Sequence, residues 1–182
     1  AGGGGGGGGR IAIYHQNAST FNFANVTAFG ATFTGTSFNG GPGTVYVQGP
    51  TRESGELNID NNNLPIPIAS RTPILGAPTT VLSLSHLRLR RNARARFGGT
   101  LNVTGTLEIS TSSEFVSGVR IITDTTSLSG NSVLTHAATT GTTSFKLDLS
   151  TDNLTIDGTS RVEATGLGFL GGGRPGNPSS TN

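Results

Sequence analysis

The sequence lacks cysteine, methionine and tryptophan, and its only lysine is Lys146. Without cysteine, the 182-residue chain can form neither a disulfide framework nor a thiolate metal site. It has no run of about 18 apolar residues, so we expect no membrane span. Charged residues make up only 12%, and the pI near 9.7 reflects a small excess of arginine, which by itself does not indicate nucleic acid as a partner.

Glycine, threonine, serine and asparagine together supply close to half of the residues. These residue types are poor helix formers, which argues against a helical bundle. Leucine, isoleucine, valine and phenylalanine still supply about a quarter of the chain, more than disordered chains contain. Apolar residues alternate over short stretches and never follow a helical period. The sequence therefore predicts an all-β, loop-rich fold.

Composition divides the chain into five parts. We expect a glycine tract (1–9), a first β region (10–63), a proline-rich excursion (64–80), a run of β coils (81–170), and a Gly/Pro/Ser-rich tail (171–182). Short strands are expected at 10–16, 41–50, 55–60, 81–84, 87–89, 93–95, 101–103, 107–109, 119–121, 145–149, 154–156 and 162–164. The five phenylalanines within 20–38 predict a local hydrophobic cluster.

A shift of 20 residues brings like residues together within 81–121. The matched pairs are Leu87 with Leu107, Leu89 with Ile109, Ala95 with Phe115, Leu101 with Ile121, Arg88 with Glu108 and Arg94 with Glu114. In stacked coils such pairs lie at strand spacing, so apolar ladders and Arg–Glu ion pairs follow. This favours a right-handed parallel β-helix (solenoid) over the alternative, a β-sandwich. We expect the coils to lengthen through loops near 111–114 and 137–144.

Five arginines within nine residues form the sharpest local feature, the arginine stripe: Arg88, Arg90, Arg91, Arg94 and Arg96. Alternation with apolar residues predicts that most of them share one outer face. Guanidinium groups suit carboxylate and phosphate, so the stripe is a candidate site for an anionic polymer such as acidic polysaccharide, lipopolysaccharide phosphate or nucleic acid. The alternative is that Glu108 and Glu114 of the next coil neutralise it. Phe97 is the only aromatic residue nearby, which argues against specific nucleic-acid binding.

Candidate catalytic and metal-binding groups are sparse. Asp148, Asp152 and Asp157 near Lys146 are weak candidates for a cation site. The histidines at 15, 86 and 136 have no metal-ligand spacing, and no nucleophile-elbow motif supports a Ser-His-Asp triad. We expect no cofactor and no enzymatic activity; a polysaccharide lyase or hydrolase is the unfavoured alternative. Sequons occur at Asn17, Asn25, Asn102 and Asn153, about the number that this composition gives by chance.

The glycine tract is either a flexible linker or, if ordered, a segment lying close against another backbone. In the second case it is a candidate surface for self-association, formed by Gly2, Gly3, Gly4, Gly5, Gly6, Gly7, Gly8 and Gly9. It lacks the Lys-Ser/Thr ending of a phosphate-binding loop.

The segments GGGRIAIYHQ, GGPGTVYVQGP, GTLNVTGTLEIS and LTIDGTSRVEATG resemble the glycine-rich repeat segments of very large secreted bacterial surface proteins. The resemblance implies a right-handed parallel β-helix, an extracellular or cell-surface location, and a role as adhesin, matrix or fibre component. It implies no catalytic residue. Because the chain starts at Ala1, we expect a processed product or a piece of a longer protein.

These observations predict an extracellular structural protein, a subunit or repeat of a surface fibre, filament or matrix that acts by self-association with copies of itself. The alternative is an adhesin or acidic-polysaccharide-binding module that uses the arginine stripe.

Overall fold

The computed structural model describes residues 4–18, 20–33, 39–50, 53–67, 71–74, 77–140 and 143–169. In these ranges the chain is all-β, as the composition predicts, and its helical content is one short 3-10 turn, η1 (Phe23–Asn25). The strands are β1 (Arg10–Tyr14), β2 (Thr44–Gln48), β3 (Glu56–Asp60), β4 (Thr72–Ile74), β5 (Val81–Leu84), β6 (His86–Arg90), β7 (Arg94–Phe97), β8 (Thr100–Ser110), β9 (Glu114–Ser117), β10 (Arg120–Ser129), β11 (Val133–His136), β12 (Leu149–Ile156) and β13 (Arg161–Val162).

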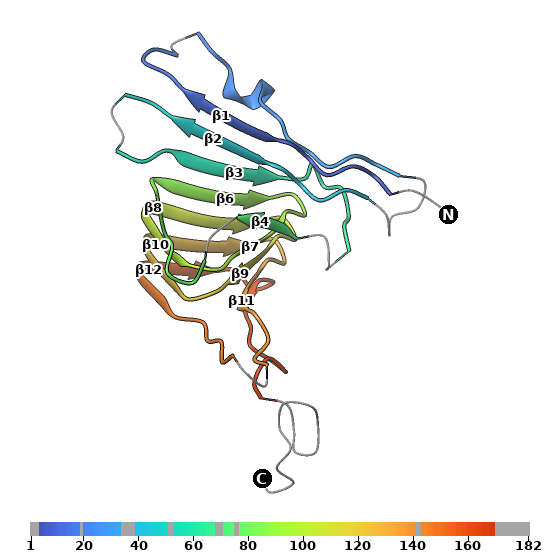
Figure 1. Cartoon of the computed structure of the whole chain (residues 1–182), viewed down its shortest axis with the longest axis vertical. Coiled ribbons are helices and arrows are strands. Elements are labelled where there is room, and N and C mark those ends of the chain that lie inside the picture. Colours follow the sequence, from blue (N-terminus) through green and yellow to red (C-terminus); the bar gives the residue numbers. More distant parts are fainter. Residues whose placement is uncertain are drawn as a thin grey trace, which may run out of the picture.

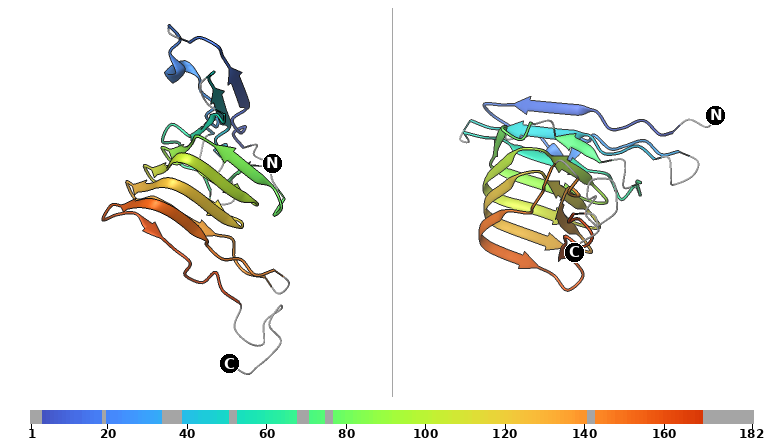
Figure 2. Two further views of the ribbon diagram at one scale, coloured as in Figure 1. Left: turned by 90° about the vertical axis from the view of Figure 1, so that its left-hand side faces the viewer. Right: turned by 60° about the horizontal axis from the view of Figure 1, so that its bottom comes forward.

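The strands form two sheets that the chain visits alternately (Figure 1). The large sheet has the order β1-β2-β3-β6-β8-β10-β12, with β5 also paired to β8, and the small sheet has the order β13-β11-β9-β7-β4. All described pairings are parallel except that of β2 with β3. Figure 2 shows the successive strands stacked as layers of one body.

The pass that begins at β5 adds β5 and β6 to the large sheet and then β7 to the small sheet, and each later pass adds one strand to each sheet. The passes run over 81–97, 100–117, 120–136 and 149–162. The predicted 20-residue register is confirmed, because Leu87 lies opposite Leu107, Leu89 opposite Ile109, Ala95 opposite Phe115 and Leu101 opposite Ile121.

The core is a set of apolar columns between the two sheets. Leu107, Ile109, Phe115 and Leu128 are fully buried, and each lies above or below a residue of the neighbouring pass. Burying a side chain of this size contributes about 1.5–3 kcal/mol relative to exposure. A one-residue slip of any strand would turn its apolar residues outward, so the columns fix the register.

Tight turns of two left-handed residues carry the chain from the large sheet to the small one. The pairs are Asn62–Asn63, Arg91–Asn92, Thr111–Ser112 and Gly130–Asn131, with φ between 50° and 65°. The turns stack: the Asn92 N–H donates to the Thr111 carbonyl at 2.8 Å, and the Ser112 N–H donates to the Gly130 carbonyl at 2.7 Å. The expectation of a lengthened loop near 111–114 is therefore wrong, whereas the long connection falls between β11 and β12, where 137–144 predicts it.

The proline-rich excursion contributes a strand of its own. β4 lies within it and pairs with β7 at the edge of the small sheet, with Pro73 opposite Arg96. Proline at this place is consistent with an edge strand, where a missing N–H costs no ladder hydrogen bond.

The buried face of the large sheet changes sides between β2 and β3. Val45 and Val47 pair with Asn58 and Glu56, so they lie on the outer face, while Leu57 of β3 points into the core. The segment that contains η1 lies over this outer face, with Phe23 and other residues of 23–29 near the two valines. Of the predicted phenylalanine cluster, the structure shows a contact between the Phe21 and Phe23 rings, whose centroids lie 4.9 Å apart. Phe38 lies outside the described residues.

Candidate functional site

The structure divides the arginine stripe between two faces of the molecule. Arg88 and Arg90 project from β6 in the large sheet, whereas Arg94 and Arg96 project from β7 in the small sheet. Arg88, Arg90 and Arg91 line one groove over the large sheet, so the prediction of a shared outer face holds for these three arginines but not for Arg94 and Arg96. The left-handed turn at Arg91, with φ of 54°, redirects the chain between the two groups, and strand alternation alone does not reveal it.

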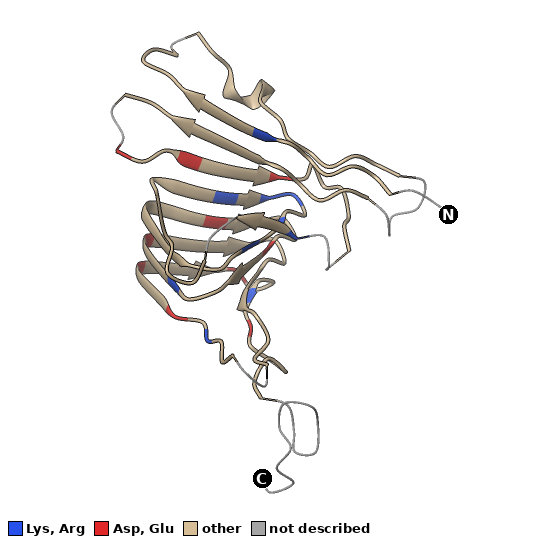
Figure 3. Ribbon diagram, viewed as in Figure 1, with Lys and Arg blue, Asp and Glu red and all other residues tan. Residues whose placement is uncertain are grey.

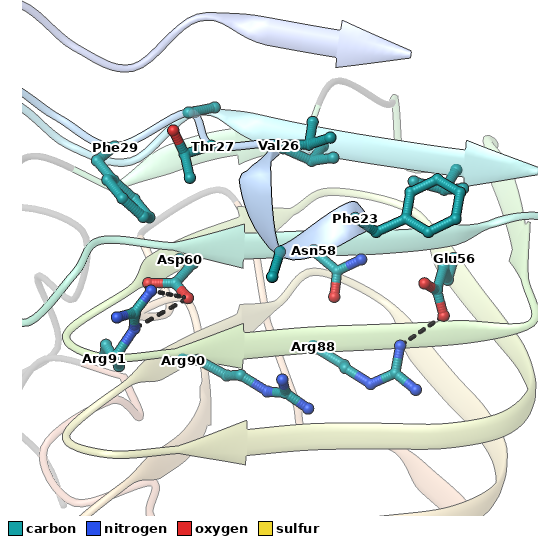
Figure 4. A pocket seen from close by; sticks show the side chains of 15 residues that line it. Phe23, Val26, Thr27, Phe29, Glu56, Asn58, Asp60, Arg88, Arg90 and Arg91 are labelled. Atoms are coloured by element: carbon teal, nitrogen blue, oxygen red, sulfur yellow. Dashed lines mark hydrogen bonds and ion pairs between the residues drawn. The ribbon is translucent and has the colours of Figure 1, made fainter. Parts of the chain in front are cut away.

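The first groove, of about 660 Å³, lies on the outer face of the large sheet (Figure 4). Its walls come from the 23–29 segment and its floor from β2, β3 and β6. Arg88 lies 2.5 Å from Glu56, and its Nε lies 3.7 Å from Glu108. Arg90 binds Glu108 with two hydrogen bonds of 2.6 and 2.8 Å.

Arg91 closes one end of the first groove. Its guanidinium donates to both carboxylate oxygens of Asp60, at 2.7 to 3.0 Å, and to the Asn62 amide oxygen at 2.9 Å. It also lies 5.4 Å from the centre of the Phe29 ring, which adds a cation–π contact.

The arginines of the first groove are charge-balanced. Arg88, Arg90 and Arg91 meet Glu56, Glu108 and Asp60, and Figure 3 shows blue and red bands on adjacent strands. Burial raises the pKa of Glu108, but the hydrogen bonds and charge of Arg90, with smaller effects of Ser110 and Arg88, outweigh it, so this pKa lies below its ordinary value. The hydrogen bonds that Arg90 donates to Glu108 likewise raise the pKa of Arg90.

The second groove, of about 610 Å³, lies on the outer face of the small sheet. Arg71 binds Glu114 through two nitrogens at 2.6 and 3.2 Å, and Arg94 lies 3.5 Å from the same carboxylate. Arg161 lies 2.6 Å from Glu163. Arg96 is exposed and has no carboxylate within ion-pair distance among the residues that the structure describes.

The predicted pairing of Arg88 with Glu108 and of Arg94 with Glu114 is confirmed in register and in contact. Sequence reasoning missed Glu56, Asp60 and Arg71. Glu56 lies 32 residues from Arg88 and Asp60 lies 31 residues from Arg91, because the pass that contains β4 is longer, so a constant 20-residue shift cannot find them. A visible signal is that Asp60-Asn61-Asn62-Asn63 ends in a left-handed turn, as Arg90-Arg91-Asn92 does.

The glycine tract packs against its own chain over the residues described. A Cβ on Gly8 would collide with the Ala28 carbonyl oxygen and the Gly43 nitrogen, and Gly5 is equally close to the Ala31 carbonyl. The Gly8 N–H donates to the Gly41 carbonyl at 2.9 Å. The expectation that an ordered tract lies close against another backbone is confirmed, and that backbone belongs to 28–31 and 40–43. Gly2 and Gly3 lie outside the described residues.

The three aspartates named as weak cation candidates do not come together. Asp148 lies 3.3 Å from Lys146 and 3.7 Å from Arg120, and Asp152 is exposed on β12. Asp157 instead closes the turn before β13, where the Gly130 N–H donates to it at 2.7 Å and the Thr159 and Ser160 N–H groups also bind it. Among the described residues, no group of three His, Asp or Glu side chains could hold a metal ion.

The other single residues are spread over the molecule. His15 lies beside Phe23, the His86 ring accepts from the Thr106 N–H, and the His136 ring binds the Ala137 carbonyl. Of the sequon asparagines, Asn17, Asn25 and Asn153 are exposed, whereas Asn102 is half-buried in β8.

Over the residues that the structure describes, the end of the stack formed by the last pass is open. Leu154 and Ile156 of β12 lie opposite Thr126 and Leu128, so they continue the core columns, and Val162 of β13 continues the column of Leu134. They are 50%, 39% and 41% exposed. At the other end, the first column residues on β3 are buried beneath β2 and the segments around it. The described part of the stack is thus covered at one end and open at the other.

Comparisons with known protein families, with curated proteins and with solved structures found no match to this chain. Within the described residues, no helix is long and apolar enough to cross a membrane.

Proposed function

We propose that this chain is an extracellular structural protein, a unit of a surface fibre or matrix that acts by associating with copies of itself. The observation that carries the proposal is the open end, where Leu154, Ile156 and Val162 extend the core columns into solvent. Soluble repeat folds cover such ends with a capping unit, and uncapped edges pair with other chains.

We further propose that the passes are coils of a right-handed parallel β-helix. Parallel pairing in both sheets, the 20-residue register and the alternation of the chain between the sheets support this. Such a rod is stiff because each pass binds the next through a full ladder of backbone hydrogen bonds and a continuous core.

The β12 edge is suited to pairing because its protection is weak. Its eight residues include one charged side chain, Asp152, and no proline or lysine, the residues that natural edge strands use against pairing. If the open ends of two copies contact each other, the association closes as a symmetric dimer. If the β12 edge of one copy instead pairs with the β1 edge of the next, the association can continue as a filament. Both associations bury the same three apolar side chains.

The experiment compares two isoleucines of equal exposure on the large sheet. Ile156 is 39% exposed at the open end, and Ile122 is 38% exposed on the outer face of β10. We expect the natural sequence to associate as its concentration rises, in sedimentation velocity and under the electron microscope. Ile156→Asp should abolish this association because a carboxylate cannot be buried in the apolar contact. Ile122→Asp should leave it unchanged.

A natural sequence that stays monomeric at several hundred micromolar, without fibres, would rule out the proposal. An equal loss with both variants would place the contact elsewhere than at the open end.

A further inference from the structure

The lining of the second groove carries a larger surplus of positive charge than that of the first groove, where Arg88, Arg90 and Arg91 stand against Glu56 and Asp60 and Arg90 is also bound by Glu108. Four arginines line the second groove, Arg71, Arg94, Arg96 and Arg161, against two carboxylates, Glu114 and Glu163. The net charge of these lining residues is +2, as large as the formal net charge of the whole chain. We propose that the second groove binds a carboxylate-bearing polysaccharide, with an acid group of the ligand held at Arg96 and Arg94.

The surplus is concentrated at one end of the groove. Arg71 and Arg94 share the single carboxylate of Glu114, and Arg96 is the cation there without a carboxylate partner among the described residues. Arg94 and Arg96 are two residues apart on β7, so both project from the same face of the small sheet. A planar guanidinium binds a carboxylate through two parallel hydrogen bonds, which suits a uronic acid group.

The rest of the groove suits a neutral, hydroxylated chain. It crosses β7, β9, β11 and β13, about 14 Å at the usual strand spacing, which is longer than a single small acid needs. Beyond the arginines its lining alternates apolar Val116 and Val133 with polar Asn131 and Thr135. Such a surface meets both the C–H faces and the hydroxyl groups of a sugar ring.

Two comparisons favour this ligand and this groove. The arginines of the first groove are engaged by Glu56, Asp60 and Glu108, so an acidic ligand there would have to displace them. The residues lining the second groove include no Phe, Tyr or Trp, whereas proteins that bind single-stranded nucleic acid stack bases on such rings. The lining therefore argues against single-stranded nucleic acid as the ligand.

The test measures binding of polygalacturonate to the full chain by calorimetry at low ionic strength. Arg96→Gln is compared with Arg10→Gln, which removes the same charge from an exposed position on β1, outside the groove. We expect Arg96→Gln to weaken binding about fivefold and Arg10→Gln to change it less than twofold, with both variants keeping the melting temperature of the natural sequence. Binding should fall as salt rises, and fully methyl-esterified polygalacturonate should not bind.

Three outcomes would overturn the proposal: no binding of polygalacturonate, equal weakening by the two variants, or tighter binding of a single-stranded DNA with the same charge. The proposal does not depend on self-association. Ile156→Asp should retain polysaccharide binding, so failure of one proposal leaves the other standing.

Discussion

Thr126 is a buried hydroxyl in an apolar column. It lies between Leu107 and Leu154, is fully buried, and its Oγ1 has no hydrogen-bond partner among the described residues. Thr123 on the same strand is also buried, but its hydroxyl contacts the carbonyl oxygens of Gly105 and Thr125 at 3.1 and 2.8 Å. The two threonines therefore have the same shape and opposite hydrogen-bonding states.

We expect Thr126→Val to raise the free energy of unfolding by about 1 kcal/mol, because it removes an unsatisfied polar group. Thr123→Val should lower it by about the same amount, because it removes satisfied hydrogen bonds. Urea titrations of both variants measure the difference. A loss of stability in Thr126→Val would mean that its hydroxyl has a partner in solution.

Asp157 makes the stability depend on pH. Hydrogen bonds to its carboxylate, the Gly130 N–H first, lower its pKa well below the ordinary value. A carboxyl group whose pKa is lowered by folding stabilises the protein above its unfolded pKa of about 4, and this contribution is lost as the pH falls toward the folded pKa. Asp157→Asn should thus be less stable than the natural sequence at pH 7, and the difference should shrink below about pH 4.

Thermal melts between pH 7 and pH 2 measure this difference. Asp152→Asn is the control, because Asp152 is exposed on β12 and accepts no hydrogen bond from the described residues. A difference between Asp157→Asn and the natural sequence that stayed constant down to pH 2 would contradict the assigned role.

At the scale of elements, the turns between the sheets carry strain that can be relieved. Thr111 occupies the left-handed region, with φ of 55°, which a β-branched residue adopts at a cost. We expect Thr111→Asn to raise the unfolding free energy by about 0.5–1 kcal/mol, since asparagine tolerates this conformation. Thr104→Asn, at an exposed position within β8, should give no such gain. Equal effects in urea titrations would show that φ is not the cause.

The glycine tract provides a second element-scale prediction. A Cβ on Gly8 would enter the backbone of 28–31 and 40–43, whereas a Cβ on Gly6 would meet nothing within 4 Å. Gly8→Ala should destabilise this layer by about 1–3 kcal/mol, the usual cost of overpacking, and Gly6→Ala should be close to neutral. Hydrogen exchange of the Gly43 and Thr44 amides, which donate to Ala28 and Gly9, reports on the layer directly. Unchanged exchange in Gly8→Ala would contradict the packing.

At the scale of the molecule, stability should decrease toward the open end. Leu107 and Leu154 belong to one core column, separated by Thr126, but Leu107 is fully buried and Leu154 is 50% exposed. Leu107→Ala should lower the unfolding free energy by about 3 kcal/mol, within the usual range for a buried leucine. Leu154→Ala should cost under about 1 kcal/mol in dilute solution.

The proposed assembly makes the decrease in stability toward the open end depend on protein concentration. If a second copy covers the open end, the cost of Leu154→Ala in thermal melts should grow with protein concentration, while that of Leu107→Ala should not. A cost of Leu154→Ala that is independent of concentration would argue against burial of this residue in the assembly.

Much of the fold could be predicted because its repeat is local in sequence. A constant shift places Leu87 over Leu107 and Arg88 over Glu108, and both follow from strand alternation and residue type. The first groove could not be predicted in the same way. Its pairs Arg88–Glu56 and Arg91–Asp60 cross the pass that contains β4, whose extra length breaks the shift.

The sequence by itself determined the all-β class, the register of the central passes and the absence of disulfide and thiolate chemistry. Periodicity and composition carry this information without reference to distant contacts. Only the tertiary structure decided that the arginine stripe is split, that the outer face of β2 is apolar, and that one end of the core is open. The split of the stripe follows from the pair of left-handed residues at Arg91–Asn92, which redirects the chain between the two sheets. The apolar outer face of β2 follows from the register that places Val45 and Val47 opposite Asn58 and Glu56. The open end follows from the position of β12 at the edge of the large sheet.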